Sequence, residues 1–304
     1  MSATFAAANG IQLCYETFGD SANPPIVLIM GLATQMIVWD DEFCAQLAAR
    51  GFWVVRFDNR DIGMSTHLSK ARIPRLAELM FAQATRIKFR VPYTLRDMAA
   101  DTVGLMDALG IRSAHAVGAS MGGFIAQELA IVYPSRLRSL TSIMSSTGDP
   151  KLPGPTPRAL AVLAKKVPLD REGYIREYVH TWSVLAGTHF PFNAERTARQ
   201  GAASYDRGIN PPGAARQMLA IIASGNRRKA LRGVTVPTLV IHGTADPLVP
   251  DAGGRDTALT IPGARLLLID GMGHSFPREV WPRIIDAIAQ HALQHEPGAP
   301  PTRS

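Results

Sequence analysis

Ser120 lies in a glycine-bounded pentapeptide, Gly118-Ala119-Ser120-Met121-Gly122. The apolar run before it is typical of a buried strand, and residues 123–132 after it are typical of a helix. A nucleophile at such a tight strand-to-helix turn needs small residues two positions before and after it, because larger side chains would collide with both elements. The same glycine and serine spacing also occurs by chance in turns without a catalytic role. Here the strand before it and the helix after it favour the catalytic interpretation. The pattern predicts that Ser120 attacks a carbonyl carbon.

A serine hydroxyl is a weak nucleophile until a base takes its proton, so this prediction requires a histidine and a carboxylate further along the chain. His274 follows the apolar run 266–269 in the sequence GMGH, and it precedes the last helical pattern. That position places it in a loop from which a base can reach the serine. We therefore expect His274 to be the base, and His242 to be a packed residue at the end of a strand.

Asp246 is the expected carboxylate. It follows the apolar run 238–241 in the sequence GTADPLVP, whose glycine and prolines shape a loop at the same level as His274. There it would hold the imidazole in one tautomer and stabilise the imidazolium. The alternatives are Asp149, which follows an earlier strand, and Asp270, which lies close before His274 in a position more typical of a turn cap.

Backbone N–H groups are expected to stabilise the negative charge that develops on the substrate oxygen. One should come from Met121, directly after the serine, and the other from Leu32 in the loop Met30-Gly31-Leu32-Ala33. Because Gly31 has no side chain, it would let this loop approach the substrate. We expect Ser120 to form an acyl-enzyme, which water then hydrolyses.

Short apolar runs bounded by turn residues predict the buried strands that must position these groups. They lie at residues 26–30, 53–57, 114–117, 137–144, 238–241 and 266–269. Helical patterns alternate with them, most clearly at 95–109, where Thr94 and Asp97 form a capping box. This alternation predicts an α/β fold with a mostly parallel sheet between two layers of helices. An antiparallel hairpin at one edge is predicted from the alternation at 12–18 and the turn at Asn9-Gly10.

Between Ser146 and Arg232 the strand pattern stops, and helical segments at 157–166, 171–185 and 213–224 replace it. Ligands of open α/β sheets bind at the carboxyl ends of the strands, so an insertion here could fold over the site as a lid. The predicted division is a core of residues 1–146 and 233–295, a helical lid of residues 147–232 after the sixth strand, and a disordered tail of residues 296–304.

A second irregular stretch, residues 66–93, contains the basic amphipathic sequence IPRLAELMFAQATRIKFR. We expect this segment to pack on its own protein. The alternatives are that it lines the entrance to the site, contacts a membrane surface or pairs with a second copy in a homodimer.

The composition is that of an ordinary globular enzyme: 304 residues, 46% hydrophobic and 19% charged. Cys14 and Cys44 are expected to remain thiols. The start, MSATFAAANG, has no basic or apolar signal region, so we expect a cytoplasmic protein without stable membrane insertion. The net charge of +7 comes from arginines scattered among acidic residues, and nucleic acid is not an expected partner. No metal or phosphate motif occurs, and no cofactor is expected.

Taken together, these motifs are similar to those of the α/β-hydrolase fold family. The resemblance rests on the order Ser120, Asp246, His274, the elbow GASMGG, the segment FDNRDIGMST after the fourth strand and the loop GMGH, and it covers about residues 10–293. The chain most resembles a bacterial branch of aclacinomycin methylesterase-like serine esterases, which have a Met-Gly oxyanion loop. Met30 departs from the wider family, where a His-Gly pair is more usual. Asp58 and Arg60, in the FDNRDIGMST segment, are expected to form structural hydrogen bonds and ion pairs.

The resemblance implies a carboxylic ester hydrolase with a helical lid and no cofactor. The expected substrates are esters with small to medium hydrophobic groups that contact Gly31, Trp39, Trp182 and Phe190. The alternatives are hydrolysis of a lactone or of a carbon–carbon bond, acyl transfer, and a ligand receptor with slow turnover. A serine at the elbow argues against dehalogenases and epoxide hydrolases, which need a carboxylate there.

Overall fold

The computed structural model describes residues 3–73 and 90–296. Within them, eight strands form one sheet in the order β1-β2-β4-β3-β5-β6-β7-β8. Neighbouring strands from β4 to β8 are parallel, and β2 is antiparallel to both β1 and β4. The strands are β1 (Thr4–Ala8), β2 (Ile11–Phe18), β3 (Pro25–Ile29), β4 (Trp53–Phe57), β5 (Ala114–Ala119), β6 (Leu137–Ile143), β7 (Thr238–Gly243) and β8 (Arg265–Ile269). The predicted mostly parallel sheet is therefore confirmed.

The predicted hairpin is formed by β1 and β2 at one edge of the sheet. Ala8 pairs with Ile11, so Asn9 and Gly10 make a two-residue turn. Both turn residues have a positive φ, 48° and 78°, as in the type I′ turn that Asn-Gly favours.

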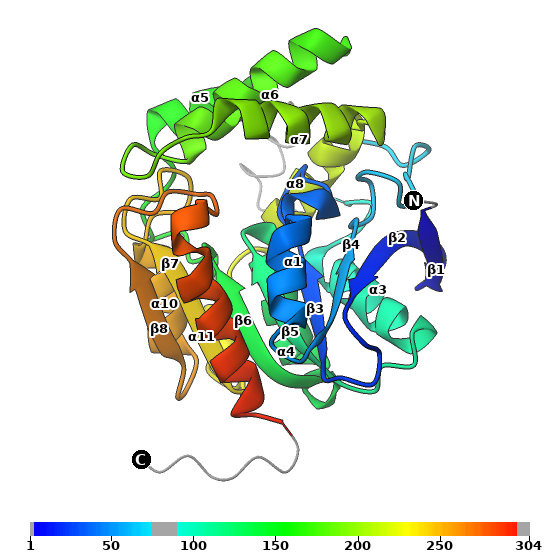
Figure 1. Ribbon diagram of the computed structural model, residues 1–304, viewed down its shortest axis with the longest axis vertical. Helices are drawn as coiled ribbons and strands as arrows, with labels where there is room; N and C mark the ends of the chain where they lie inside the picture. The colour runs from blue at the N-terminus through cyan, green and yellow to red at the C-terminus, as the bar shows by residue number, and fades with distance from the viewer. Residues whose placement is uncertain (1–2, 74–89, 297–304) are drawn as a thin grey trace.

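Helices cover both faces of the sheet (Figure 1). α1 (Asp41–Ala48) and α11 (Trp281–Leu293) lie on one face, and α3 (Leu95–Ala108), α4 (Met121–Val132) and α10 (Ala252–Thr260) lie on the other. α3 begins with the predicted capping box, in which the Thr94 N–H donates to the Asp97 carboxylate at 2.7 Å. In β3, Val27 and Ile29 pack in the α3 and α4 layer, and Ile26 and Leu28 pack in the α1 and α11 layer. Because both of its faces are buried, β3 is a continuous apolar run.

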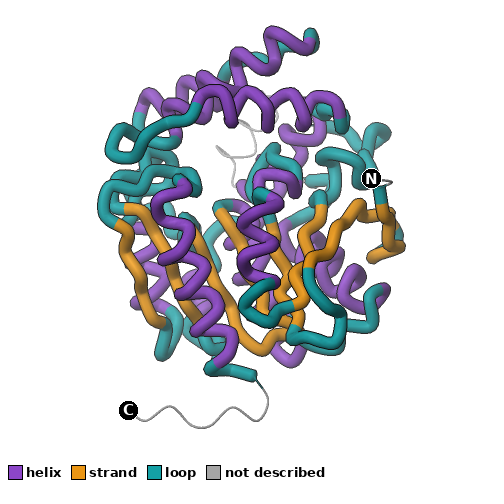
Figure 2. The backbone as a smooth tube through the Cα atoms, in the orientation of Figure 1, coloured by secondary structure: helices purple, strands orange, loops and turns teal. Residues whose placement is uncertain are grey.

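In the fully described stretch between β6 and β7 lie five helices, which we call the helical insertion. They are α5 (Pro157–Ala164), α6 (Arg171–Leu185), α7 (Ala194–Asp206), α8 (Pro211–Ser224) and α9 (Arg228–Leu231). The first three lie across one end of the sheet (Figures 1 and 2). The sequence did not predict α7, which packs through small residues: a Cβ on Gly201 would lie 3.0 Å from the Tyr178 ring of α6.

Several sequence predictions concern the surface or fall outside the described residues. Most of the amphipathic segment, at 74–89, and tail residues 297–304 lie outside them. Glu296 is described, and its carboxylate accepts two hydrogen bonds from Arg138 at 2.8 and 2.9 Å.

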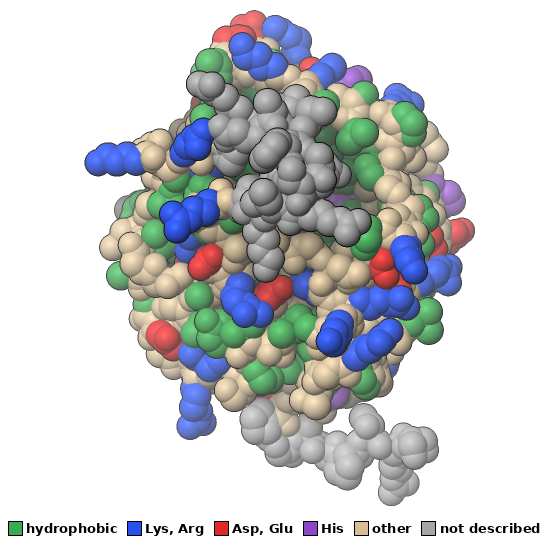
Figure 3. Space-filling view, turned by 180° about the vertical axis from the view of Figure 1, so that it is seen from behind, with side chains coloured by type: hydrophobic (Ala, Val, Ile, Leu, Met, Phe, Trp, Pro, Cys, Tyr) green, Lys and Arg blue, Asp and Glu red, His purple; other side chains and the backbone are tan. Residues whose placement is uncertain are grey.

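Across the described ranges, the helices include none long and apolar enough to cross a membrane. On the face in Figure 3, Lys and Arg side chains are spread among acidic and hydrophobic ones. Cys14 and Cys44 are free, buried thiols.

Candidate active site

Ser120 lies at the turn between β5 and α4 and is half-buried. Its φ of 55° and ψ of −120° are a conformation that residues other than glycine rarely adopt. Its N–H donates to the Ile143 carbonyl of β6 at 2.9 Å, which holds the turn in place. The flanking glycines are required by contact distances: a Cβ on Gly118 would lie 2.1 Å from the Gly122 oxygen, and a Cβ on Gly122 would lie 2.0 Å from the Ile29 oxygen.

The structure brings Ser120, His274 and Asp246 into one chain of hydrogen bonds. His274 Nε2 is 3.0 Å from Ser120 Oγ, and His274 Nδ1 is 2.7 Å from Asp246 Oδ2. The histidine and the aspartate are 4% and 6% exposed, so the charges that form on them are poorly screened by water. This arrangement can transfer the serine proton to the imidazole and stabilise the positive charge that results.

The second oxygen of Asp246 is already occupied. Oδ1 accepts hydrogen bonds from the N–H groups of Leu248 and Val249, both at 2.8 Å. The ionised carboxylate can only accept, so His274 Nδ1 carries the proton and Nε2 is left to accept one from Ser120.

The two alternative carboxylates contact other groups. Asp149 Oδ2 lies 3.4 Å from the Arg228 guanidinium, and Asp270 Oδ1 accepts a hydrogen bond from the Thr244 hydroxyl at 2.9 Å. His242 is fully buried at the end of β7, as expected, and its Nε2 is 2.8 Å from the Val249 carbonyl. Burial lowers the pKa of His242, which keeps it neutral beside Asp246.

The loop after β3 passes directly against the nucleophile. A Cβ on Gly31 would lie 3.1 Å from Ser120 Cβ and 3.6 Å from Ser120 Oγ. Within the described residues, the N–H groups of Leu32 and Met121 donate to no other protein atom. The Met121 side chain is 1% exposed and packs in the core, so only its backbone is available to a ligand. Two free N–H groups beside a serine are what an oxyanion requires.

The helical insertion also holds this loop. The Ala33 N–H donates to Gln217 Oε1 of α8 at 2.9 Å, 184 residues away in the sequence. Gln35 Nε2 donates to the Ser204 and Gly208 carbonyls, at 2.7 and 2.9 Å. Sequence reasoning missed these residues, and no local pattern marks them, because each acts on a loop far from it along the chain.

Buried ion pairs fix the segment that follows β4. Asp58 accepts a hydrogen bond from Arg207 at 2.6 Å, and Arg60 pairs with Asp101 at 2.5 Å. Asp61 forms a two-point pair with Arg216 at 2.7 and 2.8 Å. Burial alone would raise the pKa of Asp61, but the hydrogen bonds from Arg216 and the Leu68 N–H, together with the positive charge of Arg216, outweigh it and lower the pKa. The expected structural pairs of Asp58 and Arg60 are therefore present.

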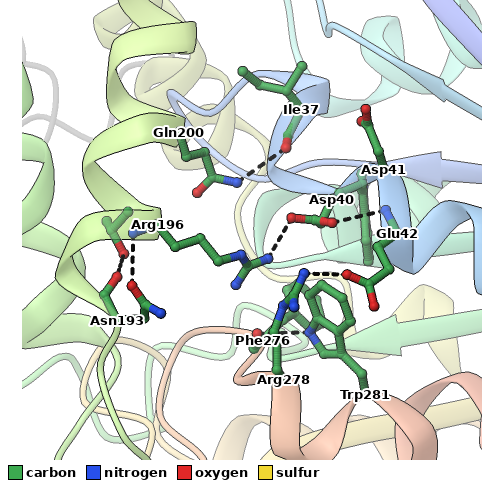
Figure 4. A network of polar contacts seen from close by, with 12 residues as sticks. Ile37, Asp40, Asp41, Glu42, Asn193, Arg196, Gln200, Phe276, Arg278 and Trp281 are labelled. Atoms are coloured by element: carbon green, nitrogen blue, oxygen red, sulfur yellow. Dashed lines mark hydrogen bonds and ion pairs between the residues drawn. The ribbon is translucent and has the colours of Figure 1, made fainter.

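The helical insertion also contacts the two loops that carry the histidine and the aspartate. The backbone N–H of His274 donates to the Leu185 carbonyl at the end of α6, at 2.7 Å. The backbone N–H of Thr156 donates to the Pro247 carbonyl at 2.8 Å. A Cβ on Gly273 would lie 2.3 Å from the Ala186 oxygen. Figure 4 shows a further contact at the rim, where Arg196 of α7 pairs with Asp40 at 2.6 Å.

Three residues predicted to contact substrate lie at different depths. Trp39 is 1% exposed and packs against Phe43 and Phe276. Its contact with substrate stays a prediction. Trp182 is partly buried in a cluster with Leu248, next to the Asp246 loop. Phe190 is partly buried against the core layer that contains Met272, beside the His274 loop. Among the described side chains, no group of three or more metal-binding residues is arranged to hold a metal ion.

Comparisons with known proteins agree with this architecture. The model of the alpha/beta hydrolase fold family matches residues 24–277. Rhodomycin D methylesterase DnrP of Streptomyces peucetius is 31% identical, over 92% of this chain and 95% of that protein. A hydrolase from Pseudomonas aeruginosa PA01 is 26% identical with a TM-score of 0.68, over 96% and 97% of the two chains. The meta-cleavage product hydrolase CumD of Pseudomonas fluorescens IP01 is 20% identical with a TM-score of 0.74, over 95% and 96%. The chain therefore belongs to the α/β-hydrolase fold family.

Proposed function

We propose that the protein hydrolyses carboxylic esters with small to medium hydrophobic groups, through an acyl-enzyme on Ser120. The observation that carries this proposal is the hydrogen-bonded chain from Ser120 through His274 to Asp246, beside the free N–H groups of Leu32 and Met121. The methylesterase relative supports an ester as the bond that is cleaved.

In the first half of the reaction, His274 Nε2 takes the Ser120 proton and Oγ attacks the ester carbonyl. The N–H groups of Leu32 and Met121 stabilise the oxyanion, and Asp246 stabilises the imidazolium. His274 then protonates the departing alcohol. In the second half, His274 takes a proton from water as the water oxygen attacks the acyl carbonyl. The bond to Ser120 Oγ then breaks, His274 returns the proton to Oγ, and the acyl group leaves as a carboxylic acid.

Apolar side chains close to the site support a preference for hydrophobic groups. Leu32, Trp182 and Phe190 are each partly buried and lie on or beside the loops that carry the reacting groups. We further propose that the helical insertion is a lid over this site. A bound acyl analogue should then slow protease cleavage within residues 147–232, and equal cleavage rates with and without it would contradict gating.

The test is hydrolysis of p-nitrophenyl acetate, butyrate and octanoate by the wild-type protein, Ser120→Ala and a matched control, Ser183→Ala. Ser183 lies on α6 and donates to the nearby His180 carbonyl of the same helix at 2.7 Å, so its loss should change little. Multiple turnovers by the wild type and the control, abolished in Ser120→Ala, would support the proposal. A folded wild-type protein without turnover on any of the three esters would contradict it.

A further inference from the structure

We infer that Gln217, on α8 of the helical insertion, is a positioning residue that holds the oxyanion loop in its working shape. This inference rests on the proposed function, because it concerns the N–H group of Leu32. Gln217 is fully buried, and its side chain reaches the loop at Ala33.

The loop needs external support because its backbone conformation is unfavourable. Ala33 has a φ of 57°, in the left-handed region that residues other than glycine seldom adopt. The Ala33 N–H donates to Gln217 Oε1 at 2.9 Å. This hydrogen bond fixes the peptide plane between Leu32 and Ala33.

The neighbouring peptide plane, between Gly31 and Leu32, is held within the loop, because the Gly31 carbonyl accepts a hydrogen bond from the Thr34 hydroxyl at 3.0 Å. Gly31 lies so close to Ser120 that even a Cβ would contact the serine side chain at 3.1 Å. Each peptide unit is planar, so the two planes that flank Leu32 together decide where its N–H points. One is held by Gln217 and the other by Thr34, and the Leu32 N–H between them donates to no described protein atom, so it is available to the reacting carbonyl.

Both ends of the Gln217 amide are used, which prevents it from flipping. Nε2 donates to the Arg60 carbonyl at 2.9 Å while Oε1 accepts from Ala33. Arg60 is in turn held by its buried pair with Asp101, and the residue before Gln217, Arg216, is held by Asp61. The amide is therefore anchored to a rigid part of the core.

The helical insertion has another glutamine that serves as a matched control. Gln200 of α7 donates to the Ile37 carbonyl at 3.2 Å (Figure 4). It accepts from the Tyr178 hydroxyl at 3.2 Å. The contact with Ile37, which follows the oxyanion loop in the sequence, also joins the helical insertion to the core. Neither of these hydrogen bonds of Gln200 involves Ala33. Replacing Gln200 therefore tests whether a weaker attachment of the helical insertion to the core lowers activity. Replacing Gln217 tests this together with the position of the Leu32 N–H.

The experiment compares wild type, Gln217→Met, Gln217→Glu and Gln200→Met by kcat and KM on p-nitrophenyl butyrate, inhibition by an alkyl boronic acid, and thermal unfolding. Methionine removes both hydrogen bonds of Gln217, and an ionised glutamate keeps the acceptor for Ala33 but cannot donate to the Arg60 carbonyl. Losing one oxyanion donor outright costs about 10²–10³-fold in kcat, and a displaced donor should cost less. We expect Gln217→Met to lower kcat about 10- to 100-fold with KM nearly unchanged. Boronic acid binding should weaken to a similar extent.

Gln217→Glu should retain most of kcat, and Gln200→Met should retain all of it. Equal losses in Gln217→Glu and Gln217→Met would overturn the inference, because the contact with Arg60 would then be responsible. A Gln217→Met variant with wild-type kcat, or one whose loss is entirely in KM, would also overturn it.

Amide hydrogen exchange of the unaltered protein gives a measurement that needs no variant and no substrate. The Ala33 N–H should be protected in the free protein, and the Leu32 N–H should exchange readily until the boronic acid binds. Fast exchange at Ala33 would overturn the inference even if the ester assays succeed. If the wild-type protein cleaves no ester, the proposed function fails, and protection of Ala33 alone then decides whether Gln217 holds the loop.

Discussion

Replacement of Asp246 by asparagine should abolish most of the activity while leaving the fold intact. Asp246 Oδ1 accepts hydrogen bonds from the N–H groups of Leu248 and Val249, each at 2.8 Å. In the variant, the amide oxygen must take this place, because an NH₂ group there would face two donors. The asparagine NH₂ is then directed at His274 Nδ1, where Oδ2 was.

The consequence follows from the tautomer of the imidazole. A donor facing Nδ1 makes that nitrogen an acceptor, so Nε2 carries the proton and cannot take one from Ser120. In a serine protease the same substitution lowers kcat about 10⁴-fold, which corresponds to about 5 kcal/mol of transition-state stabilisation. We expect a loss of this order here. Both backbone hydrogen bonds are kept, so the midpoint of thermal unfolding should change little.

The assay is kcat on p-nitrophenyl butyrate, with Asp149→Asn and Asp270→Asn as controls. These carboxylates contact Arg228 and Thr244, so both controls should remain within about threefold of the wild type, the range expected for residues outside the transition state. A folded Asp246→Asn variant that keeps more than about a tenth of kcat would refute the tautomer argument, since the predicted loss is about 10⁴-fold. Inactivity of Asp149→Asn would reassign the role to that residue.

Three further predictions concern stability, measured as the free energy of unfolding in urea. Burial lowers the pKa of His291 to about 3. Below about pH 6.5 the unfolded chain therefore binds a proton at this group that the folded protein does not. Lowering the pH from 7.5 to 5 should reduce the free energy of unfolding by about 2 kcal/mol through His291. His291→Gln should remove that slope, and an unchanged slope, or one equally altered by replacing the exposed His180, would contradict it. Gly122→Ala places a Cβ 2.0 Å from a carbonyl oxygen of β3 and should cost about 1–3 kcal/mol; no loss would mean that the elbow is loosely packed. Arg216→Met leaves the Asp61 carboxylate buried without its partner and should cost about 3–5 kcal/mol, and adding Asp61→Asn should recover part of this.

The strands and the loops after them could be predicted because each is marked locally. Parallel strands buried on both faces are mostly apolar, and the turn at Ser120 requires glycines at Gly118 and Gly122. The predicted strand at 114–117 was short, since β5 continues to Ala119. Alanine and glycine there carry too little apolar character to signal the continuation.

The contacts between the helical insertion and the core could not be predicted. α7 has no apolar stripe, because its buried residues are Gly201 and Ser204. Gln217 is polar, yet it is fully buried, since both ends of its amide are satisfied by backbone groups from two other loops. Hydrophobic periodicity predicts which apolar side chains are buried. It cannot predict the burial of a polar side chain whose hydrogen-bond partners lie far away in the chain.

Exchanging residues 147–232 for the equivalent part of a relative would transplant more than a substrate pocket. The new segment would have to offer a carbonyl to the His274 N–H where Leu185 now does, and an N–H to the Pro247 carbonyl where Thr156 now does. A chimera that matches the pocket but not these backbone positions would lose rate on every substrate, including those it binds well. Engineering of selectivity in this protein is therefore better confined to single side chains, with the backbone of the helical insertion left as it is.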